Sequence, residues 1–134
     1  MKVLVDTSVW SLALRRRAPA HPAVDALRRL VGQGRAAIVG PVRQELLSGI
    51  RDAATFERLR DHLRAFPDEP ITSADYERAA DWFNLCRAKG VQGSNTDFLL
   101  CAVAERLDVP LLTADDDFTT FGRVRPLRLF GFER

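Results

Sequence analysis

Short apolar runs along this chain alternate with longer stretches in which apolar residues recur every three or four positions. Continuous aliphatic and β-branched runs are typical of buried strands, whereas the three-to-four spacing is typical of helices that bury one face. The runs predict strands at 2–5, 36–39 and 110–113, with a further edge strand at 127–130. The spacing predicts helices over 8–17, 22–31, 41–50, 53–66, 73–88 and 96–107.

Local signals fix where several of these helices begin and end. Thr7 or Ser8 is expected to cap the first helix, and Pro41 stands at a favourable first helical position. Gly34 and Gly90 follow helical stretches, as helix-terminating glycines do. The alternation of strands and helices predicts an α/β fold in three layers, with a mostly parallel central sheet between helices.

Composition narrows the class of protein. A chain of 134 residues with 46% hydrophobic and 28% charged residues is expected to form one globular domain, residues 1–134. The net charge of +2 is too small to indicate nucleic-acid binding by itself. Cys86 and Cys101 have no metal-ligand spacing and are expected to be small buried side chains. No signal peptide or membrane-spanning run is visible, so a cytoplasmic location with no membrane partner is expected.

Four acidic residues stand at positions that one edge of such a sheet would bring together. Asp6 and Asp115 directly follow two predicted strands, Glu45 lies one turn into a helix that follows a strand, and Asp97 opens a late helix. In a parallel α/β sheet, ligands bind at the carboxyl ends of the strands. An oxygen-only ligand set there favours Mg²⁺ or Mn²⁺ over zinc.

Each acid also has a plainer interpretation. Asp6 could cap a helix, Glu45 and Asp97 could be surface carboxylates in first helical turns, and Asp115–Asp117 could form a turn. Together they are harder to dismiss, because clustered like charges strain a fold unless a cation lies among them. His21 and His62 fall in the early helices, away from these acids, and no Ser-His-Asp arrangement or phosphate-binding loop is visible.

The motifs VDTSVW, PVRQELLSG and NTDFLLCAVAERLDVPLLTADDDF together resemble the PIN-domain ribonucleases. The likeness runs from Val3 to about Phe130 and is greatest to the VapC toxins of bacterial and archaeal toxin–antitoxin modules. It implies a PIN-like domain, a Mg²⁺- or Mn²⁺-dependent endoribonuclease activity on RNA, a homodimer, and a cognate antitoxin that holds the enzyme inactive.

The resemblance also implies roles for individual residues. The metal-binding and catalytic acids of the family correspond to Asp6, Glu45, Asp97 and Asp115, and Asp117 in the trailing DF is a further metal ligand. Ser8 and Thr113 are the supporting hydroxyls. Asp116 fills a variable position and could compete with Asp117 for the site.

Other functions stay open at this point. A PIN nuclease that matures RNA without an antitoxin is one, and a non-catalytic PIN-like module that binds a basic partner is another. A phosphoaspartate enzyme is less compatible, because Ser8 stands where a haloacid-dehalogenase-like phosphatase has its second aspartate.

Overall fold

A small parallel sheet lies at the centre of the molecule, whose computed structural model describes residues 1–15, 17 and 20–132. Its strands are β1 (Val3–Val5), β2 (Ala36–Ala37) and β3 (Leu111–Leu112), in the order β2-β1-β3 and all parallel. Every residue of β1 is fully buried, as the central position of this aliphatic run requires. Leu4 pairs with Leu111 and Val5 with Leu112, which sets the register for the residues that follow.

Seven helices surround the sheet within the described part of the chain. They are α1 (Thr7–Ala13), α2 (Pro22–Gly32), α3 (Gly40–Leu47), α4 (Ala53–Leu63), α5 (Ser73–Ala88), α6 (Asn95–Leu107) and α7 (Asp117–Val124). None of the described helices has the length and apolar character needed to cross a membrane.

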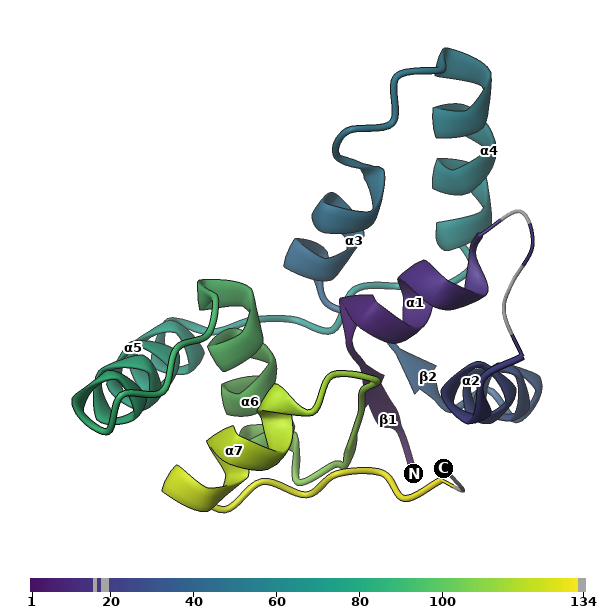
Figure 1. Ribbon diagram of the computed structural model, residues 1–134. Helices are drawn as coiled ribbons and strands as arrows, with labels where there is room; N and C mark the ends of the chain where they lie inside the picture. Colours follow the sequence, from purple (N-terminus) through teal and green to yellow (C-terminus); the bar gives the residue numbers. More distant parts are fainter. Residues whose placement is uncertain (16, 18–19, 133–134) are drawn as a thin grey trace.

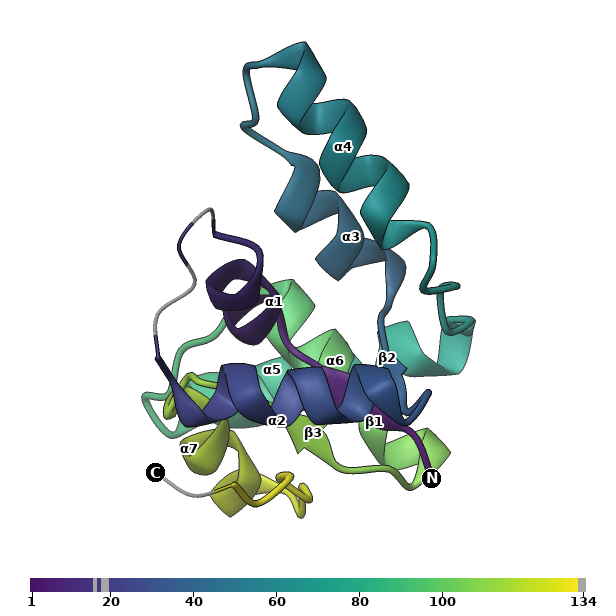
Figure 2. The same cartoon turned by 90° about the vertical axis from the view of Figure 1, so that its right-hand side faces the viewer.

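The helices form layers on the two faces of the sheet. Helices α1 and α2 lie on one side of the strands, and α5, α6 and α7 lie on the other (Figure 1). Helices α3 and α4 pack against each other and project from this body as a pair (Figure 2). The three-layer α/β/α architecture with a parallel sheet is therefore confirmed.

The carboxyl end of the chain differs from the prediction in two places. The segment 127–130 pairs with β3 through a single parallel bridge, Leu111 with Leu129, rather than as a full edge strand. Helix α7 was not predicted, because threonines and a glycine in DFTTFGRV are weak helix formers. Burial of Phe118 and Phe121 against the core stabilises it instead.

Several predicted helices are shorter in the structure. Helix α1 ends at Ala13, before the arginine run of which Arg16 lies outside the described residues. Helix α3 ends at Leu47 because the next residues leave helical geometry, with Gly49 at a φ of 84°. The N-cap position of α1 is Asp6 rather than Thr7 or Ser8, and the Asp6 side chain makes no capping hydrogen bond. That carboxylate is therefore available for other contacts.

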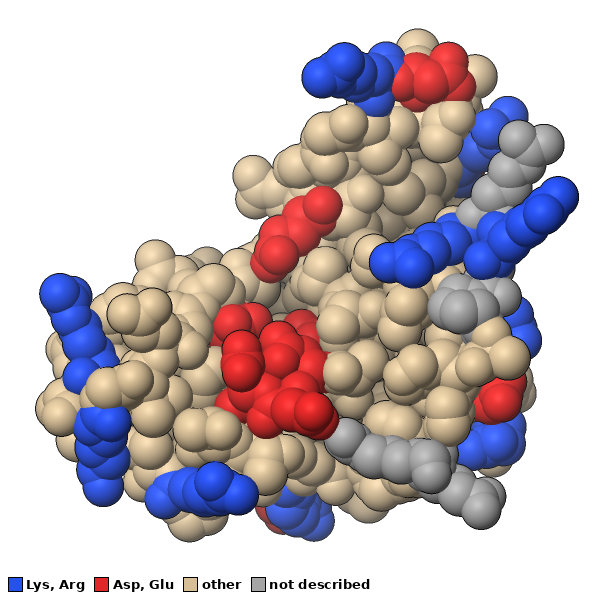
Figure 3. All heavy atoms as spheres, viewed as in Figure 1, with Lys and Arg blue, Asp and Glu red and all other residues tan. Residues whose placement is uncertain are grey.

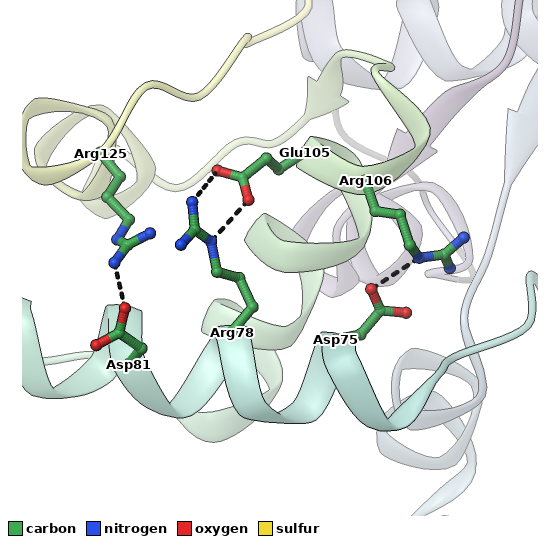
Figure 4. A network of polar contacts seen from close by, with 6 residues as sticks. All are labelled: Asp75, Arg78, Asp81, Glu105, Arg106 and Arg125. Carbon is green, nitrogen blue, oxygen red and sulfur yellow. Dashed lines mark hydrogen bonds and ion pairs between the residues drawn. The ribbon is translucent and has the colours of Figure 1, made fainter.

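Ion pairs join α5 to α6 and to the end of α7 (Figure 4). Arg106 of α6 donates to Asp75 of α5 over 2.7 Å, and its guanidinium also bonds the carbonyl of Pro70. Arg78 and Glu105 pair between the same two helices, and Arg125 reaches Asp81 from the end of α7. Only Asp75 among these acids is buried, at 2% exposure.

The buried Asp75 carboxylate gives the fold a testable dependence on pH. Burial alone would raise the pKa of Asp75, but hydrogen bonds from Arg106 and Thr72, with the Arg106 charge, outweigh it and lower that pKa. A lowered folded-state pKa stabilises the fold above the unfolded pKa of about 3.9, and this contribution is lost as pH falls through the folded pKa.

Replacing Arg106 with glutamine (Arg106→Gln) should therefore lower the free energy of unfolding by about 1–3 kcal/mol at neutral pH, since it weakens the pairing of a buried carboxylate. The deficit should shrink as pH falls below about 3.9 and through the lowered folded pKa of Asp75, where its carboxylate becomes protonated. Arg78→Gln is the matched control, because its partner Glu105 is more exposed and a smaller change is expected. Denaturant unfolding across pH measures both, and equal effects of the two variants would contradict the role of burial.

Candidate metal-binding site

Asp6 stands at the carboxyl end of the central strand, where the sheet register places it beside Thr113. Since Val5 pairs with Leu112, the next pair in register is Asp6 with Thr113, and the Asp6 N–H donates to the carbonyl of Leu112. Both side chains are buried, with exposures of 4% and 3%. The first acid is thus fixed by backbone pairing at the switch from strand to helix.

One oxygen of the Asp6 carboxylate organises the surrounding loop. Its Oδ2 accepts the hydroxyl protons of Ser8 over 2.7 Å and of Thr113 over 2.9 Å. Each hydroxyl in turn accepts a backbone N–H from the turn after β3: Ser8 from Ala114 and Thr113 from Asp115. Each hydroxyl has a single proton, and both protons are donated to Asp6, which is therefore the acceptor at the centre of the network.

The turn held by this network presents two further aspartates. Asp115 Oδ1 accepts the N–H of Asp117 over 2.9 Å, so the Asp115 carboxylate is oriented by the first turn of α7. Asp117 itself is exposed. The two acids therefore stand on a short, internally bonded segment rather than on a free loop.

Asp97 reaches the same region from the amino end of α6. It forms a reciprocal capping box with Ser94, in which Asp97 Oδ2 accepts the Ser94 N–H over 3.0 Å and Ser94 Oγ accepts the Asp97 N–H over 3.1 Å. The plainer interpretation of Asp97, a carboxylate in the first helical turn, is therefore correct as to its position, and its side chain also caps the helix. This capping fixes the side chain without excluding a second role, because a carboxylate has several acceptor positions.

The charges of these four aspartates act on one another. Burial raises the pKa of Asp6, hydrogen bonds from Ser8 and Thr113 partly offset this, and the charge of Asp97 raises it further. Burial also raises the pKa of Asp97, against its bonds to Ser94, and the charges of Asp115 and Asp117 add to the rise. Figure 3 shows acidic side chains gathered in one patch on this face, whereas most basic side chains lie toward the edges of the molecule in this view. We call Asp6, Asp97, Asp115 and Asp117 the aspartate cluster.

The sequence also suggested Glu45 and Asp116 for the site. Glu45 is an exposed residue of α3 whose side chain makes no hydrogen bond or ion pair within the described residues. Asp116 faces a different pocket, which it lines with His21 and Phe132. Asp117, rather than Asp116, is thus the residue whose charge acts on Asp97. The expectation that His21 lies away from every acid was wrong, because its helix begins beside the turn after β3.

Among the described residues, no group of three or more His, Cys, Asp or Glu side chains is arranged so that it could hold a metal ion as it stands. The aspartate cluster nevertheless offers the ligands that a hard divalent cation prefers, since all of its donor atoms are oxygens and one of its carboxylates is buried. The roles of Asp6, Glu45, Asp97, Asp115 and Asp117 as ligands and of Ser8 and Thr113 as supports stay predictions.

Tryptophans and cysteines take no part in the site. Trp10 and Trp82 are buried at 2% and 0% exposure, so both pack in the core rather than presenting a ring on which a base could stack. Cys86 and Cys101 are both buried and free, as expected of small apolar side chains in the core.

The fold and the aspartate cluster define a PIN domain, and the family model of that name matches residues 3–124. The chain belongs to this family. Among curated relatives, the VapC ribonuclease Mb1587 of Mycobacterium bovis and the ribonuclease VapC11 of Mycobacterium tuberculosis are each 30% identical over 134 residues, covering 97% of this chain and 98% of theirs.

Solved structures share the fold at lower sequence identity. VapBC2 from Rickettsia felis, solved bound to a DNA fragment from its promoter, superposes with a TM-score of 0.78 at 19% identity, covering 99% of this chain and 100% of that one. FitAcB from Neisseria gonorrhoeae superposes with a TM-score of 0.75 at 16% identity, covering 96% of each chain.

Two substitutions at Asp97 separate its charge from its capping bond. Asp97→Asn keeps an oxygen that can accept the Ser94 N–H but removes the charge, so it should raise the metal-free melting temperature at neutral pH. Asp97→Ala removes both, and the lost hydrogen bond should cost about 1 kcal/mol.

Because the folded pKa of Asp97 is raised, the charge penalty is present above that pKa and disappears as pH falls through it. The stabilisation by Asp97→Asn should therefore fade at acid pH. Melting curves in EDTA at several pH values measure this, and an Asp97→Asn variant no more stable than the wild type at neutral pH would show that repulsion is negligible.

Proposed function

We propose that this chain is a Mg²⁺- or Mn²⁺-dependent endoribonuclease that acts as the toxin of a toxin–antitoxin module. The observation that carries the proposal is the aspartate cluster at the carboxyl edge of the sheet, with Asp6 buried and two of its carboxyl groups raised in pKa. Full-length similarity to relatives named VapC ribonucleases supports the activity.

In this proposal the residues of the site have two roles, binding the cation and orienting its ligands. Asp6, Asp97, Asp115 and Asp117 would hold the cation, and Glu45 would join them from α3. Ser8 and Thr113 would keep Asp6 in one orientation through the hydroxyl bonds to its Oδ2. The bound cation would supply an activated water and stabilise the charge on the scissile phosphate.

Hydrolysis by in-line attack would leave a 5′-phosphate and a 3′-hydroxyl. Single-stranded or looped RNA is the better substrate, because its bases and backbone are accessible without opening a duplex.

The aspartate cluster also suits regulation by a protein partner. An arginine or lysine side chain from an antitoxin would compensate the same negative charge as the metal and block its site. The solved structures that share this fold include VapBC2 and FitAcB. We extend to this chain both the cognate antitoxin and the homodimer common in the family.

Two rival functions use the same fold. A PIN nuclease for RNA maturation would cleave RNA without an antitoxin, and a small gene for a partner protein directly upstream would argue against it. A non-catalytic module that binds a basic peptide would keep the acids without any cleavage.

A cleavage assay with single-stranded RNA tests the activity. The wild-type chain should cut in Mg²⁺ or Mn²⁺, stop in excess EDTA, and recover when the metal is restored. Asp6→Asn should lose most of the activity, about 100-fold or more, because it removes a charge that the site needs while keeping the shape of the side chain. Full cleavage in excess EDTA would reject the metal mechanism.

Asp25→Asn is the matched control, since Asp25 is an exposed aspartate of α2 that should leave cleavage unchanged. Expression in cells that lack an antitoxin adds the readout for toxicity. The wild-type chain should arrest growth and Asp6→Asn should not, whereas equal growth with both would contradict the toxin assignment.

A further inference from the structure

A second pocket opens beside the loop that leads into Asp97. It has a volume of about 260 Å³ and is lined by Phe83, Arg87, Val91, Gln92, Gly93 and Phe98. Phe98 directly follows Asp97, and the loop of the pocket ends at Ser94, the capping partner of Asp97. Figures 1 and 2 place the loop between α5 and α6 on the same face as the turn before α7.

Tight packing holds the loop of this pocket in place. A Cβ atom at Gly93 would lie 2.6 Å from Cζ of Phe121 and 2.9 Å from Cε2 of Phe98, so only glycine fits without moving these rings. The Phe98 ring lies 4.7 Å from that of Phe121 and 5.6 Å from that of Phe83. The pocket is therefore a rigid feature connected to the position of Asp97.

Two polar side chains, those of Arg87 and Gln92, border the pocket. The side chains of Arg87 and Gln92 are both exposed and make no hydrogen bond or ion pair with any described residue. The Gln92 amide can donate and accept hydrogen bonds, as the edge of a nucleobase does. The Arg87 guanidinium suits bidentate binding of a phosphate.

We propose that this pocket binds one unpaired base of the RNA substrate and its adjoining phosphate, next to the bond that is cut. Gln92 reads the edge of the base, Arg87 binds the phosphate, and half-buried Phe83 and Val91 supply the apolar wall. A cation here also offsets the repulsion that an RNA strand meets at the aspartate cluster. Gln92 thereby determines part of the sequence preference. This inference rests on the proposed ribonuclease function.

The test uses a pool of single-stranded RNA of random sequence and three variants of the full chain. Gln92→Ala should reduce the base preference at one position beside the cut by about fivefold or more, while cleavage of the pool as a whole persists in Mg²⁺. Arg87→Ala should weaken binding of the pool, measured by fluorescence anisotropy in EDTA, by about tenfold. Lys89→Ala is the control, because it removes the same charge two residues away without lining the pocket.

The outcomes are distinct. Wild-type sequence preference in Gln92→Ala, or equal loss of affinity in Arg87→Ala and Lys89→Ala, would overturn the proposal. Unchanged melting temperatures in the three variants would exclude loss of the fold as the cause of any effect. If the wild-type chain binds the pool without cutting it, the ribonuclease function fails, while the affinity comparison still decides whether the pocket binds RNA.

Discussion

The structure of the candidate site depends on one carboxylate oxygen. Oδ2 of Asp6 accepts two hydroxyl protons, and through Ser8 and Thr113 it holds the backbone N–H groups of Ala114 and Asp115. These bonds connect the end of the central strand to the turn that presents Asp115 and Asp117. Since the Asp6 carboxylate is an acceptor in both bonds, the network favours its ionised form in a place where burial opposes it.

Among the described residues, no ion pair neutralises the negative charge of this arrangement. Elsewhere in the protein the buried acid Asp75 is paired with Arg106, and the pKa of that carboxyl is lowered. In the aspartate cluster burial raises the pKa of Asp97, and the charges of its acidic neighbours Asp115 and Asp117 raise it further. Asp75 is buried and paired with an arginine, whereas Asp97 is half-buried and has no basic partner among the described residues. This contrast is the physical argument that a cation from outside the chain binds at the aspartate cluster. It also explains why one site could serve both a metal and a basic side chain of an antitoxin.

Much of this could be predicted from the sequence, because strand runs and acid positions are local signals. Asp6 and Asp115 follow strands, so the parallel topology alone placed them at one edge. Helix α7 was missed because its stability comes from burying Phe118 and Phe121 against residues distant in sequence. The pocket with Gln92 and Arg87 was missed for a similar reason. Its loop needs a glycine at position 93 because the ring of Phe121 lies so close, and no local sequence pattern predicts that contact. Glu45 was placed in the site from its position after β2, and it stands on α3, which with α4 projects from the body, so its part in the site stays a prediction.

The most direct test of the cation site is thermal unfolding of the wild-type chain and Asp6→Asn in EDTA and in increasing Mg²⁺. Mg²⁺ that binds only the folded state at about 100 times its dissociation constant should add about 2.7 kcal/mol to the free energy of unfolding. In a domain of this size each kcal/mol raises the melting temperature by about 2–4 °C. The wild-type chain should show this rise, and Asp6→Asn should start from a higher metal-free melting temperature and rise less. Melting temperatures that Mg²⁺ leaves unchanged through the millimolar range in both proteins would contradict a metal site at the aspartate cluster.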